Sequence, residues 1–576
     1  MSKEVLENVD ALDDFEERAD HVSEDTLRTG TVVGDWFEVI ARSLVAKGTV
    51  FVIGPRGCGK THMMRYAWLK CCEQKNNPLA VYVSFNRYLR LEPLLKTRND
   101  ALSLFQTWVL CRVLLSANET AERLYKADAN VESIDIFENF GLIKDQVEGL
   151  VSRLERAGVL SQAEEVVANA VTIEGVVLSL DRLAKHFGRA RSVLLLDDAA
   201  LVFTPEFMVE FFDVVRVLKR QTISLKCSVY PGTTEYGPRF HADHEGRFVP
   251  AWLPVDHASY CQIMGSIGQK RHVGSMPSAD VNELLMYASF GVPRAYLTML
   301  RELHSETAER STHSQAAVNK VIQNHRDGRI GEFKTLKLKM PKFSTVIGAG
   351  EQLFEAIIKT LKAENENLAE LGTKQLLLGM PSSDLTSLHS RMVKLLLEAG
   401  LLFESPEVSH GPDRKYRRFT PHLAALIAAR AFSERSRGSS AAQTVAFIQR
   451  RPAKHPVRRS LPSLLPASIT VQLDLPPCQA CKTQRLNEQQ KFCHNCGTRL
   501  ADDSTFTRLM KLPISDVANL SVWARDSIQK LGIKTIEELL ALDDPGTELR
   551  KIYMVGPQRA KEYLSRVEAY IDEALS

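Results

Sequence analysis

The sequence of 576 residues contains no apolar run that approaches the length of a membrane-spanning helix. Its N-terminus is acidic, unlike the basic start of a signal peptide. The net charge of +3 is too small to indicate a strongly charged partner. We therefore expect a cytoplasmic protein that has no membrane partner.

Residue constellations typical of nucleases, proteases and deaminases are also missing. If the protein serves such an activity, we expect the effector to be another chain. The hydrophobic content of 44% and the charged content of 25% are ordinary for globular proteins, and the length suffices for three to five domains. Six of the ten cysteines are scattered, which is typical of reduced thiols in a cytosolic chain.

The most informative segment is 54–61, which reads Gly-Pro-Arg-Gly-Cys-Gly-Lys-Thr and has the spacing of a phosphate-binding loop. An apolar strand at 49–53 precedes it and a helix at 61–69 follows it, which is the context that this motif needs. Lys60 would reach the β- and γ-phosphates of ATP, and the Thr61 hydroxyl would bind Mg²⁺. The ATP-binding residues that we expect here are Gly54, Gly57, Gly59, Lys60, Thr61 and His62.

A second half of this site is predicted at 193–198, where four apolar residues run into two acids. A buried parallel strand would present both carboxylates at the edge where α/β sheets bind ligands. Asp197 would hold Mg²⁺, and Asp198 would orient or deprotonate the attacking water. Asp198 has a shorter side chain than the glutamate that many relatives have at this position. This suggests slow hydrolysis, in which ATP acts more as a conformational switch than as an energy source.

The predicted fold class is α/β, with a doubly wound parallel sheet of five strands. The segment at about 98–185 is helical in pattern and longer than a minimal domain needs. It is either an extra cover for the sheet or an insertion that binds a partner. The strands are expected at 49–53, 80–85, 193–196, 223–230 and 248–253.

Polar residues near the fourth strand are further candidates. Ser228 or Thr233 could contact the γ-phosphate or the water, and the alternative is that they are plain turn residues. Arg239 or Arg247 could reach the γ-phosphate of a neighbouring subunit as an arginine finger, which would require a homo-oligomer. The alternative for either arginine is a solvated loop position.

Residues 290–295 read Phe-Gly-Val-Pro-Arg-Ala and lie in a helical stretch after the fifth strand. Together with the phosphate loop, the paired acids and the polar fourth strand, they resemble AAA+ ATPases of the origin-recognition and STAND-like branch. The resemblance covers roughly 15–435. It implies a helical lid in which Arg294 contacts the γ-phosphate, whereas without it Arg294 is only an arginine after a helix-starting proline.

The pattern at 341–435, helices followed by two short strands around a basic turn at 409–414, predicts a winged helix. The resemblance implies one at this place too. Its third helix, with His389, Arg391 and Lys394, would enter the major groove of DNA. The alternative is a winged helix that contacts protein.

The segment 436–476 is rich in Pro, Ser and Ala, carries a cluster of basic residues and is expected to be a flexible linker. It is followed at 477–501 by two C-x-x-C pairs separated by eleven residues, a spacing that places four thiolates around Zn²⁺. Residues 492–497, Phe-Cys-His-Asn-Cys-Gly, resemble the second knuckle of a zinc ribbon. The predicted ligands are Cys478, Cys481, Cys493 and Cys496.

The last segment, 502–576, contains glycine turns at Gly532 and Gly556. It resembles paired helix–hairpin–helix units, close in pattern to the C-terminal domain of the bacterial RNA polymerase alpha subunit. Its turns could present backbone N–H groups to DNA phosphates, with Arg559 and Lys561 beside them. The alternative is a small helical domain that binds protein.

The combination resembles origin-recognition-like ATPases of prokaryotic defence or mobile-element systems, which implies a nearby-encoded effector, for instance a phosphoribosyltransferase-like protein. Two alternatives stay open: a replication or transposition initiator, and a scaffold that binds ATP without hydrolysing it. The predicted divisions are an ATPase core at 1–270, a lid at 271–340, a winged helix at 341–435, a linker at 436–476, a zinc ribbon at 477–501 and a helical tail at 502–576.

Overall fold

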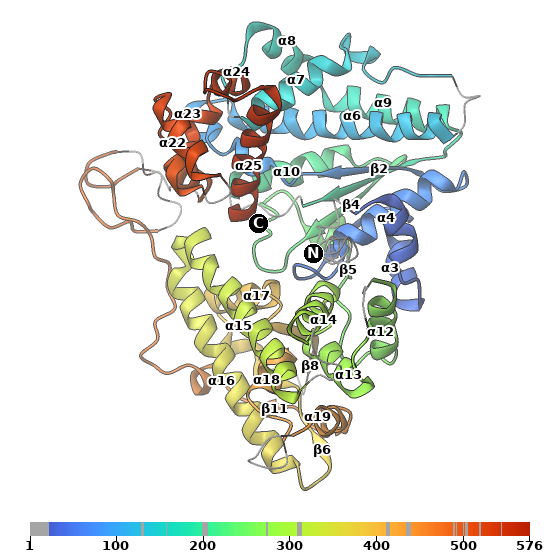
Figure 1. Cartoon of the computed structure of the whole chain (residues 1–576), viewed down its shortest axis with the longest axis vertical. Coiled ribbons are helices and arrows are strands. Elements are labelled where there is room, and N and C mark those ends of the chain that lie inside the picture. Colours follow the sequence, from blue (N-terminus) through green and yellow to red (C-terminus); the bar gives the residue numbers. More distant parts are fainter. Residues whose placement is uncertain are drawn as a thin grey trace.

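The computed structural model is shown in Figure 1. Much of the acidic N-terminal stretch and the tip of the predicted wing lie outside the described residues. The residues that the structure describes are 22–127, 132–156, 158–198, 205–271, 275–307, 314–409, 415–433, 439–487, 490, 492–498, 500, 505–517, 520–542 and 544–575.

A five-stranded parallel sheet forms the centre of the N-terminal half, as predicted. Its order is β2-β3-β4-β1-β5, so β1, which precedes the phosphate loop, lies between β4 and β5. Three of the strands are almost entirely buried because both faces of the sheet are covered; β1 and β3 are largely apolar, whereas β4 also buries Ser224, Lys226 and Ser228. The strands are β1 (Thr49–Ile53), β2 (Leu79–Ser84), β3 (Ser192–Asp197), β4 (Ile223–Val229) and β5 (Gly246–Pro250).

Helices cover both faces of this sheet (Figure 1). One layer packs Phe105 and Trp108 of α6 against Phe85 and Phe207. The predicted helical insertion therefore contributes to the core of the sheet. The helices are α2 (Glu24–Gly30), α3 (Asp35–Val45), α4 (Lys60–Glu73), α5 (Leu94–Thr97), α6 (Ala101–Ala127), α7 (Lys144–Glu155), α8 (Gln162–Ala170), α9 (Ile173–His186), α10 (Pro205–Leu218) and α11 (Ala242–Glu245), with 3-10 turns at Tyr88–Leu91 and Glu138–Phe140.

Among the described residues, α6 is the one helix long and apolar enough to cross a membrane by length and composition. The sequence-based expectation that no run approaches this length was therefore too strict. In the structure, 72% of its most apolar window is buried inside the protein. Its apolar residues are accounted for by the core that they form with β2 and α10.

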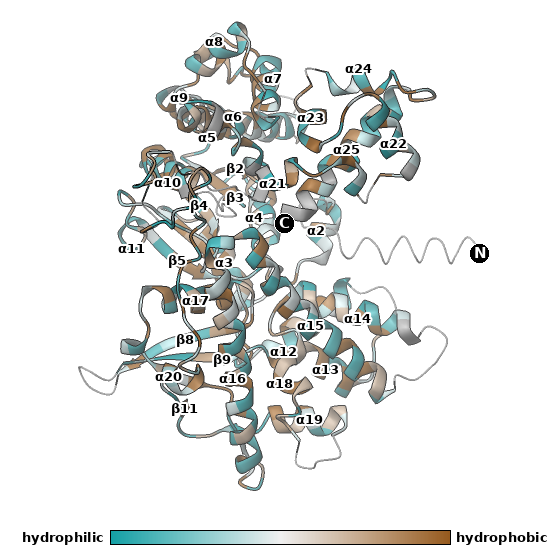
Figure 2. Cartoon of the chain, turned by 90° about the vertical axis from the view of Figure 1, so that its left-hand side faces the viewer, coloured by the Kyte–Doolittle hydropathy of each residue, from teal (hydrophilic) through white to brown (hydrophobic). Residues whose placement is uncertain are grey.

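A second apolar core joins the other face of the sheet to the helices that follow β5. Three of these helices, α13, α14 and α15, occupy the region expected for the lid, and Figure 2 shows α12, α13 and α15 close to α18 and α19. The elements are α12 (Tyr260–Arg271), α13 (Ala279–Ala288), α14 (Pro293–Thr307), α15 (Gln315–Lys339), α18 (Leu423–Ala428) and α19 (Ala441–Ile448).

Residues 344–421 contain the helix–strand–helix–hairpin order expected of a winged helix, and we call them the hairpin domain. The hairpin is antiparallel, with β7 added to its free side. The winged-helix assignment itself stays a prediction. The elements are α16 (Ser344–Leu368), β6 (Thr373–Lys374), β7 (Leu378–Pro381), α17 (Ser387–Glu398), β8 (Leu402–Ser409) and β9 (Lys415–Pro421), with 3-10 turns at Pro341–Phe343 and Ser382–Asp384.

The prediction of a flexible linker over 436–476 is wrong for most of that segment. β10 (Arg451–Pro452) pairs with β6, β11 (Val457–Arg458) pairs with β7, and α20 (Leu461–Leu464) follows. Composition was misleading because a few apolar residues, spread among Pro, Ser and Arg, are buried against the lid and the hairpin domain. These residues are Val445, Phe447, Ile448, Val457, Leu461, Leu464 and Leu465.

The regular elements of the tail are helices, and an isolated antiparallel bridge joins Pro513 to Thr535. Gly532 has a φ of +89°, a left-handed conformation that favours glycine, and it makes the turn between two helices. Arg90 at the edge of the sheet domain pairs with Glu568 of the last helix at 3.5 Å. The helices are α21 (Thr505–Met510), α22 (Val522–Lys530), α23 (Ile536–Leu540), α24 (Pro545–Leu549) and α25 (Pro557–Leu575), with a 3-10 turn at Ile514–Asp516.

Candidate nucleotide site

The predicted phosphate loop joins β1 to α4. Gly57 and Gly59 have φ values of +81° and +99°, which residues with a side chain rarely adopt. Gly59 is the N-cap of α4, and Lys60 is its first residue. The backbone N–H groups at this helix end therefore have the arrangement that binds phosphate oxygens in such loops.

The side chain of Lys60 is folded back onto its own loop. Its Nζ donates to the carbonyl oxygens of Gly54 at 2.7 Å and Pro55 at 3.1 Å. It also lies 3.9 Å from the ring centroid of Tyr230. Burial lowers the pKa of Lys60. The loop carbonyls thus accept two of the three N–H donors of the ammonium, and a nucleotide that engages these two would compete with the carbonyls.

Asp197 ends β3 and is completely buried. One carboxylate oxygen, Oδ2, accepts a hydrogen bond of 3.0 Å from the Tyr82 hydroxyl of β2. The other, Oδ1, accepts from the backbone N–H of Asp198 at 3.0 Å. The carboxylate is thus oriented from two sides, which is what a Mg²⁺ ligand requires.

Asp198 adopts a left-handed backbone conformation, with a φ of +53°. Its N–H also donates to Ser228 Oγ on β4 at 2.9 Å. The structure therefore brings Ser228 next to the two acids, as expected from the fourth strand. Its hydroxyl here holds the backbone of Asp198, and a contact to the γ-phosphate stays a prediction.

The turn that starts α14 lies against the phosphate loop. A Cβ atom on Gly57 would lie 3.1 Å from Val292 Cγ1 and 3.3 Å from Arg294 Cβ. Arg294 is exposed and lies beside the loop at Gly57. Its contact with the γ-phosphate is not tested by this geometry.

Residues of the hairpin domain reach the same site, which the sequence did not predict. Glu398, at the end of α17, accepts hydrogen bonds from the N–H groups of Gly232 at 2.9 Å and Thr233 at 2.7 Å. The Thr233 hydroxyl donates to it at 3.1 Å. Burial raises the pKa of Glu398, and the hydrogen bonds from Thr233 oppose this shift.

Residues 26–218 match the protein-family model described as ORC-CDC6-like. This segment of the chain is therefore ORC-CDC6-like. The central parallel sheet with helices on its faces agrees with this assignment. The comparison with curated proteins found no match.

Two solved structures from Aeropyrum pernix are also similar to the chain. The ORC1 protein in complex with DNA is 16% identical, with a TM-score of 0.31, over 73% of this chain and 94% of that one. The ORC2 protein, described as ADPNP-ADP complexes, is 13% identical, with a TM-score of 0.31, over 74% of this chain and 98% of that one. At these TM-scores the likeness carries no argument about the arrangement of the domains.

Three other predicted residues, His62, Arg239 and Arg247, have partners elsewhere in the sheet domain. His62 Nε2 is 2.8 Å from Thr31 Oγ1, and burial lowers the pKa of His62 to about 4, which keeps the imidazole neutral. Arg239 pairs with Asp213 at 3.6 Å and is 73% exposed. Arg247 pairs in register with Val50, towards the end of β1 that is opposite the phosphate loop. An arginine finger therefore stays a prediction.

α17 is the predicted third helix of the winged helix, and its contacts differ from those expected of a DNA-reading helix. Arg391 is paired with Glu235 at 3.0 Å and lies over the ring of Phe343 at 5.2 Å. Lys394 is exposed, but its carbonyl faces the turn at Gly232. In this arrangement α17 is packed on the segment that follows β4, and its predicted entry into a DNA groove stays a prediction.

The four predicted zinc ligands lie together, with all Sγ atoms within 4.8 Å of one another. The separations of Cys478 from Cys496 and of Cys481 from Cys493 are both 3.5 Å. A tetrahedral Zn²⁺ with bonds of about 2.3 Å would separate its sulfurs by about 3.8 Å. The two knuckles also match in backbone, because the residues after them, Lys482 and Gly497, both have left-handed φ values.

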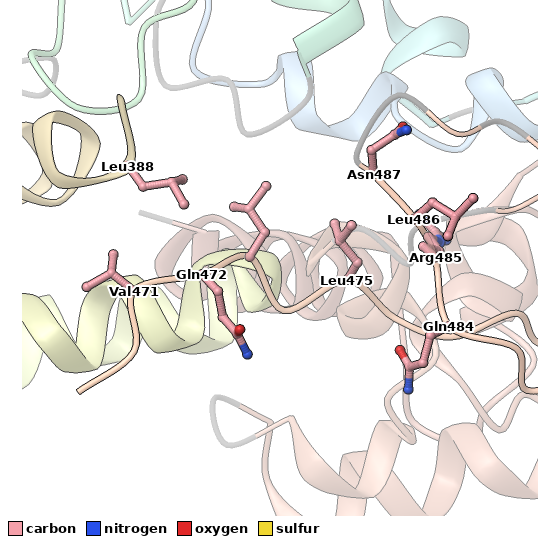
Figure 3. Close-up of a pocket in the computed structure, with 9 residues that line it drawn as sticks. Leu388, Val471, Gln472, Leu475, Gln484, Arg485, Leu486 and Asn487 are labelled. Atoms are coloured by element: carbon pink, nitrogen blue, oxygen red, sulfur yellow. The ribbon is translucent and has the colours of Figure 1, made fainter. Parts of the chain in front are cut away.

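A pocket of about 440 Å³ opens between the hairpin domain and the cysteine-containing segment (Figure 3). Leu388 of α17 lies on one side, residues of 471–475 form the floor, and 484–487 close the other side. The lining is mostly leucine and side-chain amides. It contains no carboxylate or nucleophile, so it offers no second reactive centre.

Proposed function

We propose that this chain binds ATP at its phosphate loop and uses it as a conformational switch, with slow hydrolysis. The observation that carries the proposal is the meeting of four segments at one site. The phosphate loop lies against the turn of α14 and the turn after α17, and the ends of β3 and α17 are hydrogen-bonded to β4 and to the turn that follows it. A change at the loop therefore acts directly on both the lid and the hairpin domain.

The same residues would hold Mg²⁺. Thr61 is the first-turn hydroxyl of α4, and Asp197 is a buried carboxylate fixed by Tyr82, so both are oxygen ligands of the kind that Mg²⁺ prefers. The ion would neutralise charge on the β- and γ-phosphates. Asp198 is the residue proposed to orient the attacking water, and Arg294 to contact the γ-phosphate.

We further propose that the tail contacts DNA phosphates. Its support is the start of α25, where Gly556 and Pro557 precede Arg559 and Lys561 on the first turn. Since α17 is packed on the segment that follows β4, the tail is the better candidate for a first DNA contact. Binding protein instead stays the alternative.

Removal of residues 477–576 tests this proposal. The cut spares Asp474, whose carboxylate accepts two hydrogen bonds of 2.6 Å from Thr345. The affinity of the full chain for duplex DNA, measured by fluorescence anisotropy, is expected to fall with salt by a slope of about two to four counterions. The shortened chain is expected to lose that slope while it keeps ATP binding and a cooperative melt. An unchanged slope would make the tail a protein-docking domain.

We propose that the four-cysteine cluster binds one structural Zn²⁺. Four thiolates close the coordination shell, so the ion would stabilise this short segment and perform no catalysis. The purified protein is expected to carry about one zinc per chain by elemental mass spectrometry. Cys493→Ser should release it and raise hydrogen exchange within 477–500 only.

Cys261→Ser is the matched control, because Cys261 lies outside the cluster and is partly buried. This variant is expected to keep its zinc. A wild-type protein without zinc, purified without chelators, would contradict the assignment.

A role in prokaryotic antiviral defence, beside an effector such as a phosphoribosyltransferase-like protein, stays a proposal that rests on the resemblance of the domain combination. A replication or transposition initiator differs from it by sequence-specific DNA binding. A scaffold that binds ATP without hydrolysing it would show no ATP turnover. Sequencing of nucleic acid that co-purifies from native cells, together with identification of bound proteins, separates these roles.

A further inference from the structure

The contact between α17 and the turn after β4 is built as an anion site. Two successive backbone N–H groups and one hydroxyl converge on the carboxylate of Glu398. Consecutive N–H groups in a turn bind anions in this way. The approach also depends on Gly232, because a Cβ atom there would lie 2.8 Å from Lys394 O and 3.0 Å from Leu395 Cα.

This anion site adjoins the phosphate loop. β4 pairs with β1 up to the last residue before the loop, Ile53 opposite Val229. The next residue, Tyr230, lies under the ammonium of Lys60. On the other side, a Cβ atom on Gly400 would lie 3.5 Å from Pro55 Cβ, so the turn that follows Glu398 rests on the loop itself.

We propose that Glu398 is a latch that ATP opens: its carboxylate holds the hairpin domain on the turn at Gly232 and Thr233, and the γ-phosphate of ATP opposes this contact. The inference rests on the proposed ATP site. The carboxylate interacts electrostatically with Lys60 and Arg56, two cations of the loop that would bind the phosphates. A γ-phosphate adds negative charge to a partly buried place that already holds one.

The latch would couple the nucleotide to the position of a whole domain. Arg391 pairs with Glu235, and the rings of Trp252 and Phe403 pack edge to face at 5.0 Å, across the same boundary. Trp252 also borders Gly54 of the loop, but its ring carries no charge that a phosphate would repel. Glu398 is the charged group among them that faces the phosphate loop, so it is the one that can transmit the γ-phosphate.

The test compares nucleotide affinities of the wild type and Glu398→Gln by calorimetry. The amide keeps the shape and one hydrogen-bond acceptor but removes the charge. Since ATP no longer has to overcome that charge, the variant is expected to bind ATP about 10-fold more tightly. ADP lacks the γ-phosphate, so its affinity is expected to change by less than about 3-fold.

Glu404→Gln is the matched control. Glu404 is also a carboxylate of the hairpin domain, but it pairs with Arg417 at 2.6 Å and does not contact the turn. Its ATP affinity is expected to equal that of the wild type. Thermal melting of all three proteins without nucleotide checks that each is folded.

Hydrogen exchange gives a second measurement. In the wild type, ATP is expected to raise exchange at 230–235 and at 394–401, whereas ADP has a smaller effect. In Glu398→Gln, exchange there is expected to be raised before nucleotide is added. Equal ATP affinities in the wild type and Glu398→Gln, or protection of both segments by ATP, would overturn the latch alone. A folded wild type that binds no ATP would overturn the proposed function and the latch with it.

Discussion

Lys60→Ala is expected to abolish measurable ATP binding, a loss of about 100-fold or more in affinity, because it removes the cation that faces the β- and γ-phosphates. In the structure this ammonium is already held at the loop, where it donates to Gly54 O and Pro55 O. Isothermal calorimetry with ATP and Mg²⁺ measures the loss.

Lys70→Ala is the control for this variant. Lys70 lies near the other end of α4 and pairs with Glu73 at 3.2 Å, so it shares the helix but not the loop. Its ATP affinity is expected to stay within about 2-fold of the wild type, since exposed pairs contribute little. Undiminished ATP binding by a folded Lys60→Ala protein would refute the assignment of the site.

The sheet was predictable because its signals are local. β1 to β3 are short, largely apolar runs followed by a turn or a motif, and β1 was predicted with its exact bounds, Thr49–Ile53. β5, which is not apolar throughout, spans Gly246–Pro250 and was predicted too late, at 248–253. The phosphate loop and the acids after β3 follow from the same local pattern. The topology of the sheet then brings Ser228 to Asp198, since β3 and β4 are neighbours.

The residues that complete the site were not predictable in this way. Glu398 is 165 positions from Thr233 along the chain, and it ends a helix that reads as an ordinary amphipathic one. Tyr82 is one aromatic residue in a buried strand, and only the pairing of β2 with β3 places its hydroxyl at Asp197. The contact of Glu398 depends on the packing of two domains, and that of Tyr82 depends on the pairing of two strands. Hydrophobic periodicity encodes neither.

Asp198→Asn is expected to keep ATP binding while the rate of hydrolysis falls by about 100-fold or more, the scale of a lost general base. The substitution suits this position because asparagine, like aspartate, tolerates the left-handed backbone that Asp198 adopts, with its φ of +53°. The N–H that donates to Ser228 is also unchanged. A change in the rate of hydrolysis is therefore caused by the loss of the carboxylate and not by a change in the backbone at this position.

Steady-state phosphate release measures the turnover, and calorimetry measures binding of the same protein. Ser228→Ala is an informative partner variant, because it removes the acceptor for the Asp198 N–H but leaves both carboxylates in place. It is expected to reduce turnover less than Asp198→Asn does. If Asp198→Asn instead loses ATP binding while its melting temperature is unchanged, Asp198 belongs to the Mg²⁺ site, and the residue that positions the attacking water must come from another segment at this edge of the sheet.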